Sequence, residues 1–113
     1  MLRRALFALP LLVATALAPA QAQNCDTRFN FHNRSSRTVT EIYFDASSNP
    51  NWTRDELGAD VLPAGRSRAF RAAYSGLYDF KAVLDTGRSV ELRRVDICRI
   101  TDVTLTDRGL SAQ

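Results

Sequence analysis

Apolar and polar residues alternate with a period of two along most of the chain after residue 26. The clearest stretch is residues 77–85, where Tyr78, Phe80, Ala82 and Leu84 fall on one face. This alternation predicts a β-strand with one fully apolar face.

A turn and a returning strand follow this first strand. The sequence DTGR at residues 85–88 predicts a tight turn, and residues 88–100 predict the returning strand. The parity of the apolar residues changes at Arg93-Arg94. That change predicts a β-bulge or a switch of sheet.

Three more strands are predicted from the same period. Residues 27–33 place Phe29 and Phe31 on one face. Residues 38–46 form a second strand with Ile42 and Phe44 on one face and Val39 and Tyr43 on the other, and residues 101–107 form the last strand. The residues after 107 are predicted to fray.

A further strand ends near Phe70, but its pattern is irregular. Arg66 and Arg68 have the parity of Phe70. Either the arginines lie beyond the sheet edge or a bulge intervenes.

Six or seven short strands at spacings near ten residues, without a long helical stretch, define the predicted fold class. We expect an all-β protein, a small antiparallel β-sandwich with immunoglobulin-like topology. A small barrel is the alternative.

The first 22 residues predict a secretory signal peptide. Arg3 and Arg4 precede an apolar run, and Ala20-Gln21-Ala22 fits the small-x-small cleavage rule. Cleavage after Ala22 leaves a single domain at residues 23–113, and cleavage after Ala20 is the second candidate. A retained anchor is the competing interpretation, but the run is shorter than the roughly 20 residues of a bilayer crossing. We expect a periplasmic or secreted bacterial protein, without stable membrane insertion after cleavage.

The net charge changes when this segment is removed. Loss of Arg3 and Arg4 lowers the formal charge from +3 to +1. A chain this close to neutral has no long-range field to attract nucleic acid or an anionic membrane, so we expect no nucleic-acid partner.

Cys25 and Cys98 are the only two cysteines. After a signal peptide an even count predicts a disulfide, against two free or intermolecular thiols. The bridge would close a loop of about 74 residues and contribute roughly 4 kcal/mol to stability.

Residues 45–56, DASSNPNWTRDE, carry side-chain oxygens at the ligand spacing of a calcium-binding helix–loop–helix hand. However, Pro50 occupies the sixth position, where that loop needs glycine for a sharp turn. Thr53 and Glu56 instead match a capping box, with Gly58 as a C-cap, which predicts one short helical turn. We expect no metal ion and no cofactor.

Trp52 is the large apolar residue of this loop. It is either a lid over one end of the sandwich, above Leu57 and Val61, or an exposed contact for a partner. The candidate partner-binding loop is therefore Trp52, Arg54 and Asp55.

Groups for catalysis are scarce. His32 is the only histidine, and it has the outward parity of its strand. Neither a GxSxG elbow, a CxxC pair nor a phosphate loop occurs. We expect no enzyme activity and no catalytic residues.

A set of spaced residues resembles a group of small secreted bacterial proteins of unknown function. The set comprises Trp52, Leu57-Gly58, Leu62-Pro63-x-Gly65, Tyr78-Asp79-Phe80, Asp85-x-Gly87 and Val95-Asp96-x-Cys98. It covers nearly all of residues 23–113, and the resemblance implies no activity, cofactor or binding residues. In that group a second cysteine commonly stands just before the Tyr-Asp pair, where this chain has Ser75-Gly76-Leu77.

The sequence thus predicts a non-enzymatic binding module of the bacterial envelope, with a protein or a surface glycan as partner. The alternatives are an inhibitor of an exported hydrolase (a lysozyme or a protease) and a structural or stress-related periplasmic protein.

Overall fold

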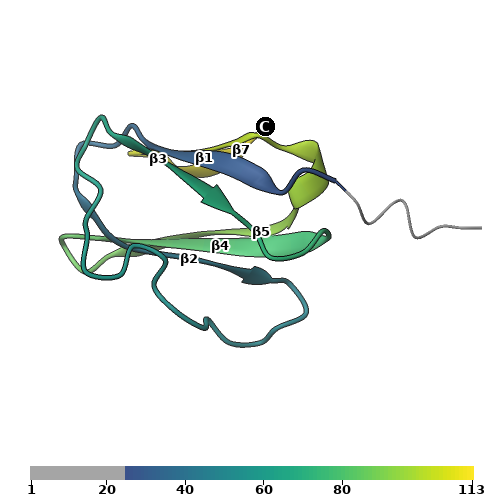
Figure 1. The fold of residues 1–113 in the computed structure, drawn as a ribbon. Helices are drawn as coiled ribbons and strands as arrows, with labels where there is room; N and C mark the ends of the chain where they lie inside the picture. Colours follow the sequence, from purple (N-terminus) through teal and green to yellow (C-terminus); the bar gives the residue numbers. More distant parts are fainter. Residues whose placement is uncertain (1–24) are drawn as a thin grey trace, which may run out of the picture.

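A computed structural model describes residues 25–113, which form two packed β-sheets (Figure 1). The first sheet has the order β3 (Ser67–Arg71), β1 (Arg28–Asn33), β6 (Asp102–Thr106) and β7 (Gly109–Ala112). The second has the order β2 (Val39–Ala46), β4 (Leu77–Leu84) and β5 (Ser89–Asp96). A short 3₁₀-helix, η2 (Ile97–Arg99), connects β5 to β6. Within this part of the chain, no helix has the length and hydropathy needed to span a membrane.

The predicted β-sandwich is confirmed, and all neighbouring strands are antiparallel except β1 and β6, which pair in parallel. The strand order differs from the predicted immunoglobulin-like one. In an immunoglobulin constant domain the first two strands are neighbours in one sheet, whereas here β1 and β2 belong to different sheets. The predicted signal peptide, residues 1–22, lies outside the described residues.

Aromatic rings from both sheets form the centre of the core. The Phe29 ring of β1 lies 5.1 Å from that of Phe44 and 5.4 Å from that of Phe80, in edge-to-face geometry. Phe31 is fully buried beside them. The period-two pattern of β1 and β4 therefore identified the inward faces correctly.

Two predictions about strands are wrong. Val39 is fully buried, although its parity is that of the half-buried Tyr43, because the pairing of β2 with β4 shifts register between Val39 and Glu41. The residues after 107 do not fray. They form β7, and the Gln113 amide donates to the carbonyl of Asp102 at 3.0 Å.

The predicted bulge at Arg93-Arg94 is confirmed. The pairing of β4 with β5 shifts register between Tyr78 and Phe80, so Asp79 faces two residues of β5. Arg94 has a φ of 59°, the only positive φ of a non-glycine residue in residues 25–113. A left-handed conformation is unfavourable for arginine, and the Asp79 carboxylate offsets part of that cost by accepting from the Arg94 amide at 2.9 Å.

The irregular pattern of β3 is explained by its position at the edge of the sheet. The Arg68 guanidinium lies 5.3 Å from the centre of the Phe70 ring and 3.5 Å from the Asp60 carboxylate. The Arg68 side chain therefore lies over the Phe70 ring at the edge of the core and keeps its charged end outside the core, as long side chains with charged ends do.

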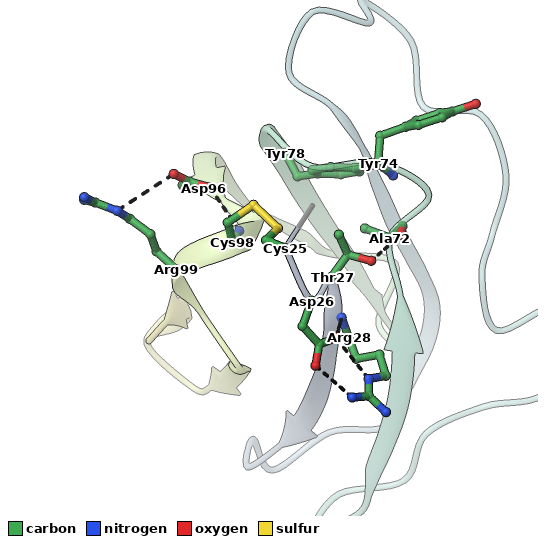
Figure 2. Close-up of a disulfide and its surroundings, with 10 residues drawn as sticks. All are labelled: Cys25, Asp26, Thr27, Arg28, Ala72, Tyr74, Tyr78, Asp96, Cys98 and Arg99. Atoms are coloured by element: carbon green, nitrogen blue, oxygen red, sulfur yellow. Dashed lines mark hydrogen bonds and ion pairs between the residues drawn. A yellow bond between two sulfur atoms is a disulfide. The ribbon is translucent and has the colours of Figure 1, made fainter. Parts of the chain in front are cut away.

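The predicted disulfide between Cys25 and Cys98 is confirmed (Figure 2). The two Cα atoms lie 5.5 Å apart. The bridge joins the segment before β1 to η2, so it fixes the start of the first strand to the connection between the two sheets.

Candidate functional site

The loop at residues 47–66 runs from β2 to β3 and covers the open edge of β2. The Asp55 carboxylate accepts from the Ile42 amide at 2.9 Å, and the Glu56 amide donates to the Ile42 carbonyl at 2.7 Å. The Asp55 carboxylate and the Glu56 amide thus make the two hydrogen bonds at Ile42 that a neighbouring strand would otherwise make. Covering an edge in this way prevents pairing with other chains.

The predicted capping box does not form. The Thr53 hydroxyl and amide both donate to the Asp45 carboxylate. Asp55 accepts from the Leu57 amide at 2.9 Å, as aspartates do in Asx turns. The residues around Gly58, whose φ is 62°, form turns rather than a helical turn.

The oxygens with calcium-hand spacing do not meet at one point. Ser47 donates to Asp79 at 2.7 Å, and Asn49 accepts from the Asn51 amide at 3.1 Å. Asp45 is engaged by Thr53, as described above. Among residues 25–113, no three histidine, cysteine, aspartate or glutamate side chains gather at metal-binding distance.

Trp52 lies against the outer face of the β2–β4–β5 sheet. Its ring centre is 6.1 Å from that of Tyr43, 5.8 Å from the Lys81 ammonium and 5.2 Å from the Arg93 guanidinium. Each cation lies over an aromatic face, an arrangement that attracts electrostatically. The expected lid over Leu57 and Val61 is wrong, because the contacts are with this outer face and Val61 is 52% exposed.

Asp79 connects the residues around Trp52 through hydrogen bonds. Although its strand parity is outward, it is buried, and it accepts from Ser47, the Arg94 amide and Arg93, the last at 2.9 Å. Burial raises its pKa, but the three hydrogen bonds and the Arg93 charge outweigh burial, so the pKa lies below its ordinary value. Asp79 therefore remains a carboxylate that links the loop, the bulge and the cation beside Trp52.

Tyr43 is tied to the same face through a hydrogen bond from its hydroxyl to the Glu41 carboxylate. That bond favours the protonated phenol and, with burial and the Glu41 charge, raises the pKa of Tyr43 to about 12. The Tyr43 ring, which the Trp52 ring contacts, is thus held in place by a specific hydrogen bond.

A second feature, absent from the sequence prediction, lies at the disulfide end. We name residues 71–75 (RAAYS), which run from the last residue of β3 toward β4, the Tyr74 ridge. The Tyr74 side chain is 76% exposed, and Figure 2 shows its ring directed away from the disulfide. Its amide donates to the Tyr78 hydroxyl at 3.0 Å, which holds the backbone under the exposed ring.

Three hollows meet at the Tyr74 ridge. One of about 500 Å³ separates it from the loop residues Thr53, Arg54 and Glu56. A second, of about 510 Å³, lies on the side of the disulfide, and a third, of about 600 Å³, lies on the outer face of β1 and β3. Arg71 lines all three. Concave surface around an exposed aromatic residue is the usual shape of a binding site.

Arg71 is the cation available to a ligand at this ridge. Arg28, its pairing partner across β1 and β3, is already held by Asp26 through two hydrogen bonds of 2.9 and 2.8 Å (Figure 2). The hydrogen bonds from Arg28 keep the pKa of Asp26 well below its usual range. Arg71 itself makes no ion pair within residues 25–113.

The three predicted partner-binding residues do not share one surface. Asp55 is committed to the backbone of β2. Trp52 lies on the outer face of its sheet, whereas Arg54 lines the hollow beside the Tyr74 ridge. Tyr74 was missed because a single tyrosine between two strands has no local signal of exposure.

Three polar side chains on the outer face of the other sheet form a hydrogen-bonded chain, here named the Ser–His–Asp chain. His32 Nδ1 lies 2.6 Å from Ser67 Oγ, and Nε2 lies 2.7 Å from an oxygen of Asp102. Because a carboxylate only accepts, Nε2 donates to Asp102, while Nδ1 faces the serine hydroxyl. The hydrogen bond from His32 lowers the pKa of Asp102.

These residue types are those of a serine-hydrolase triad, but their surroundings are different. None of the three hollows, all within residues 25–113, is lined by Ser67 or His32. Acyl transfer also needs donors that stabilise an oxyanion beside the nucleophile. The sequence indicated the outward position of His32 but not its partners, which are 35 and 70 residues away.

A scan against protein-family models, a search of curated proteins and a search of solved structures each found no match to this chain.

Proposed function

We propose that this protein is a non-enzymatic binding module, exported to the bacterial envelope, that recognises a protein or a surface glycan through the Tyr74 ridge. The observation that carries the proposal is the 76% exposure of Tyr74 between two hollows on a backbone fixed by hydrogen bonds. The disulfide supports export, because such bonds persist mainly in oxidising compartments.

Residue chemistry supports the choice of this ridge over the Trp52 face. Tyrosine and arginine are enriched among the residues that dominate binding energy at interfaces, and both Tyr74 and Arg71 are exposed here. Trp52, in contrast, is half-buried, with Lys81 and Arg93 over its ring. A ligand would have to displace those cations to stack on it.

The rigidity of the ridge lowers the entropic cost of binding. The Thr27 hydroxyl donates to the Ala72 carbonyl at 2.7 Å, and the Ala72 amide donates to the Thr27 carbonyl at 3.1 Å. The neighbouring disulfide at Cys25 fixes the same segment (Figure 2). A surface that is ordered before binding retains more of its contact energy as affinity.

The test is site-specific photo-crosslinking in the native cell. A photoreactive phenylalanine analogue at position 74 is expected to capture a discrete partner, whereas the same analogue at exposed Ser111 on β7 is not. For a glycan partner, the readout is retention on isolated envelope polysaccharide, which Tyr74→Ala should weaken about tenfold, because interface tyrosines commonly contribute more than 1 kcal/mol. Equal capture at both positions, together with unchanged retention by Tyr74→Ala, contradicts the proposal.

A second candidate function is inhibition of an exported hydrolase. It is favoured by the same projecting tyrosine, because a rigid exposed loop suits insertion into an active-site cleft. Micromolar protein is assayed against lysozymes and proteases, with Tyr74→Ala as the matched control. Loss of enzyme activity that depends on Tyr74 supports this candidate, and full activity throughout excludes it for the enzymes tested.

A further inference from the structure

The end of the sandwich opposite the disulfide carries a cluster of arginines. Four turns meet there, at the left of the view in Figure 1. They carry Arg34 and Arg37 between β1 and β2, Arg66 before β3, Arg88 between β4 and β5, and Arg108 between β6 and β7. We name these five residues the arginine tip.

Hydrogen bonds between the turns show that they lie side by side. The Asn33 amide donates to the Arg66 carbonyl at 2.9 Å, which joins the β1–β2 turn to the start of β3. The Ser36 amide donates to the Asp107 carboxylate at 2.8 Å, which joins it to the β6–β7 turn. The ion pair between Arg37 and Asp85 joins the β4–β5 turn to the β1–β2 turn, so the five arginines lie in adjacent turns at one end of the sandwich.

Charge is unevenly distributed between the tip and the remainder of the molecule. Residues 34–38, 63–66, 85–88 and 107–108, which form these turns, contain the five arginines and two acids, Asp85 and Asp107, so they carry a formal charge of +3, whereas residues 25–113 together carry +1. Arg37 pairs with Asp85 at 2.9 Å. The other four arginines of the tip make no ion pair within residues 25–113.

An exposed apolar segment adjoins this positive surface. Val61 is 52% exposed, and Pro63 and Ala64 are exposed beside Arg66. Between them, Leu62 exchanges two backbone hydrogen bonds with Val39, so the segment is held in place. Clusters of basic side chains are attracted to anionic lipid headgroups, and apolar area buried in the headgroup layer adds to that attraction.

A hollow of about 360 Å³ opens within the tip. Its lining includes Ser36, Arg37, Thr86, Arg88 and Asp107. Two guanidinium groups and several hydroxyls are donors suited to a phosphate group, which arginine can bind through two parallel hydrogen bonds. The lone carboxylate is already engaged by Ser36.

We propose that the arginine tip docks on the phosphate groups of an anionic lipid bilayer, without insertion of any segment across it. A ligand that contacts four turns and the apolar segment together must be broad, which a bilayer surface is. The total charge of the chain led to the expectation that no long-range field attracts an anionic membrane. That expectation takes no account of positive charge concentrated at one end of the molecule. The proposal is independent of the Tyr74 ridge, which lies at the opposite end.

The test is flotation of the purified protein, expressed from the full chain, with vesicles. Vesicles of phosphatidylglycerol and phosphatidylcholine are compared with vesicles of phosphatidylcholine alone, and inorganic polyphosphate is a soluble competitor. We expect flotation only with the anionic vesicles, and it should weaken as salt rises, because the screening length falls to about 8 Å at physiological ionic strength.

Two triple variants with equal charge provide the matched comparison. The tip variant is Arg34→Gln, Arg66→Gln and Arg108→Gln, and the control variant is Arg28→Gln, Arg94→Gln and Arg99→Gln at the opposite end. Each basic residue near an anionic surface strengthens binding severalfold, so the tip variant should bind at least about tenfold more weakly and the control within about twofold of the parent.

Three results would overturn the proposal. They are absence of flotation with anionic vesicles at low salt, equal loss of binding in both variants, and binding to polyphosphate without binding to vesicles. The last result would identify a soluble polyanion as the ligand instead. Circular dichroism of both variants confirms that they are folded before either is compared.

Discussion

Replacement of Asp79 by alanine is the most informative perturbation of the described structure. The substitution removes the acceptor of the Arg94 amide at the bulge and of the Ser47 hydroxyl in the loop, and it removes the ion pair with Arg93. We expect the bulge to lose its main support and Trp52 to lose the fixed cation over its ring.

The expected loss of stability follows from these three contacts. A part-buried hydrogen bond from an amide to a carboxylate contributes about 2 kcal/mol, and a bond from a hydroxyl about 1 kcal/mol. The Arg93 side chain is 56% exposed, so its pair with Asp79 contributes at most about 1 kcal/mol. The free energy of unfolding should fall by about 3–4 kcal/mol, which lowers Tm by roughly 15–25 °C in a domain of this size.

Asp79→Asn is the matched control. Its amide keeps one acceptor oxygen for Arg94 and Ser47 but loses the charge that pairs with Arg93, so it should cost less than half as much. Stability is measured by urea denaturation followed through the emission of Trp52, the only tryptophan. An alanine variant within 1 kcal/mol of the parent, or an asparagine variant equal to the alanine one, would refute this account of Asp79.

The pH dependence of the same experiment has a defined sign. Because the pKa of Asp79 is below its ordinary value, the carboxylate stabilises the folded protein above the unfolded-state pKa of about 3.9. This contribution is lost as the pH falls through the folded-state pKa. Acid unfolding of Asp79→Asn should therefore depend less on pH than that of the parent.

Three other predictions concern separate parts of the molecule. Serine in place of both Cys25 and Cys98 should lower the free energy of unfolding by about 4 kcal/mol, because the unfolded chain regains the freedom of a long loop, as measured by urea denaturation. Tyr43 should titrate near pH 12 when its ionisation is followed by ultraviolet absorbance, and Glu41→Gln should move that titration toward the ordinary pKa of about 10. The contribution of the Tyr43–Glu41 bond to the free energy of unfolding should be fully present below about pH 10 and lost as the pH rises toward 12. Ser67 should not react with a fluorophosphonate probe, and labelling that disappears in Ser67→Ala would show that the Ser–His–Asp chain activates it.

The period-two pattern predicted the fold wherever the information is local. In β4, Tyr78, Phe80, Ala82 and Leu84 were predicted to share one apolar face, and all four are buried. The parity change at Arg93-Arg94 likewise identified the bulge. Val39 was misassigned because a register shift in its pairing, rather than its own sequence, turns it inward.

The candidate site was less predictable because it depends on contacts between distant residues. Thr53 and Glu56 have the sequence pattern of a capping box, but in the structure the Thr53 hydroxyl donates to the buried Asp45 instead. The exposure of Tyr74 follows from the path of a connection that no periodicity describes. The arginine tip depends on which turns share an end of the sandwich, and that is a property of topology.

The parallel pairing of β1 with β6 has a consequence for the order in which the protein matures. β1 lies between β3 and β6 in its sheet, yet β6 begins about seventy residues later in the chain. The first strand to emerge from a ribosome or an export channel therefore lacks one of its two neighbouring strands until residues 102–106 have followed it. Contacts this remote in sequence slow folding, so the interval before they form is when the chain is most open to proteases and chaperones.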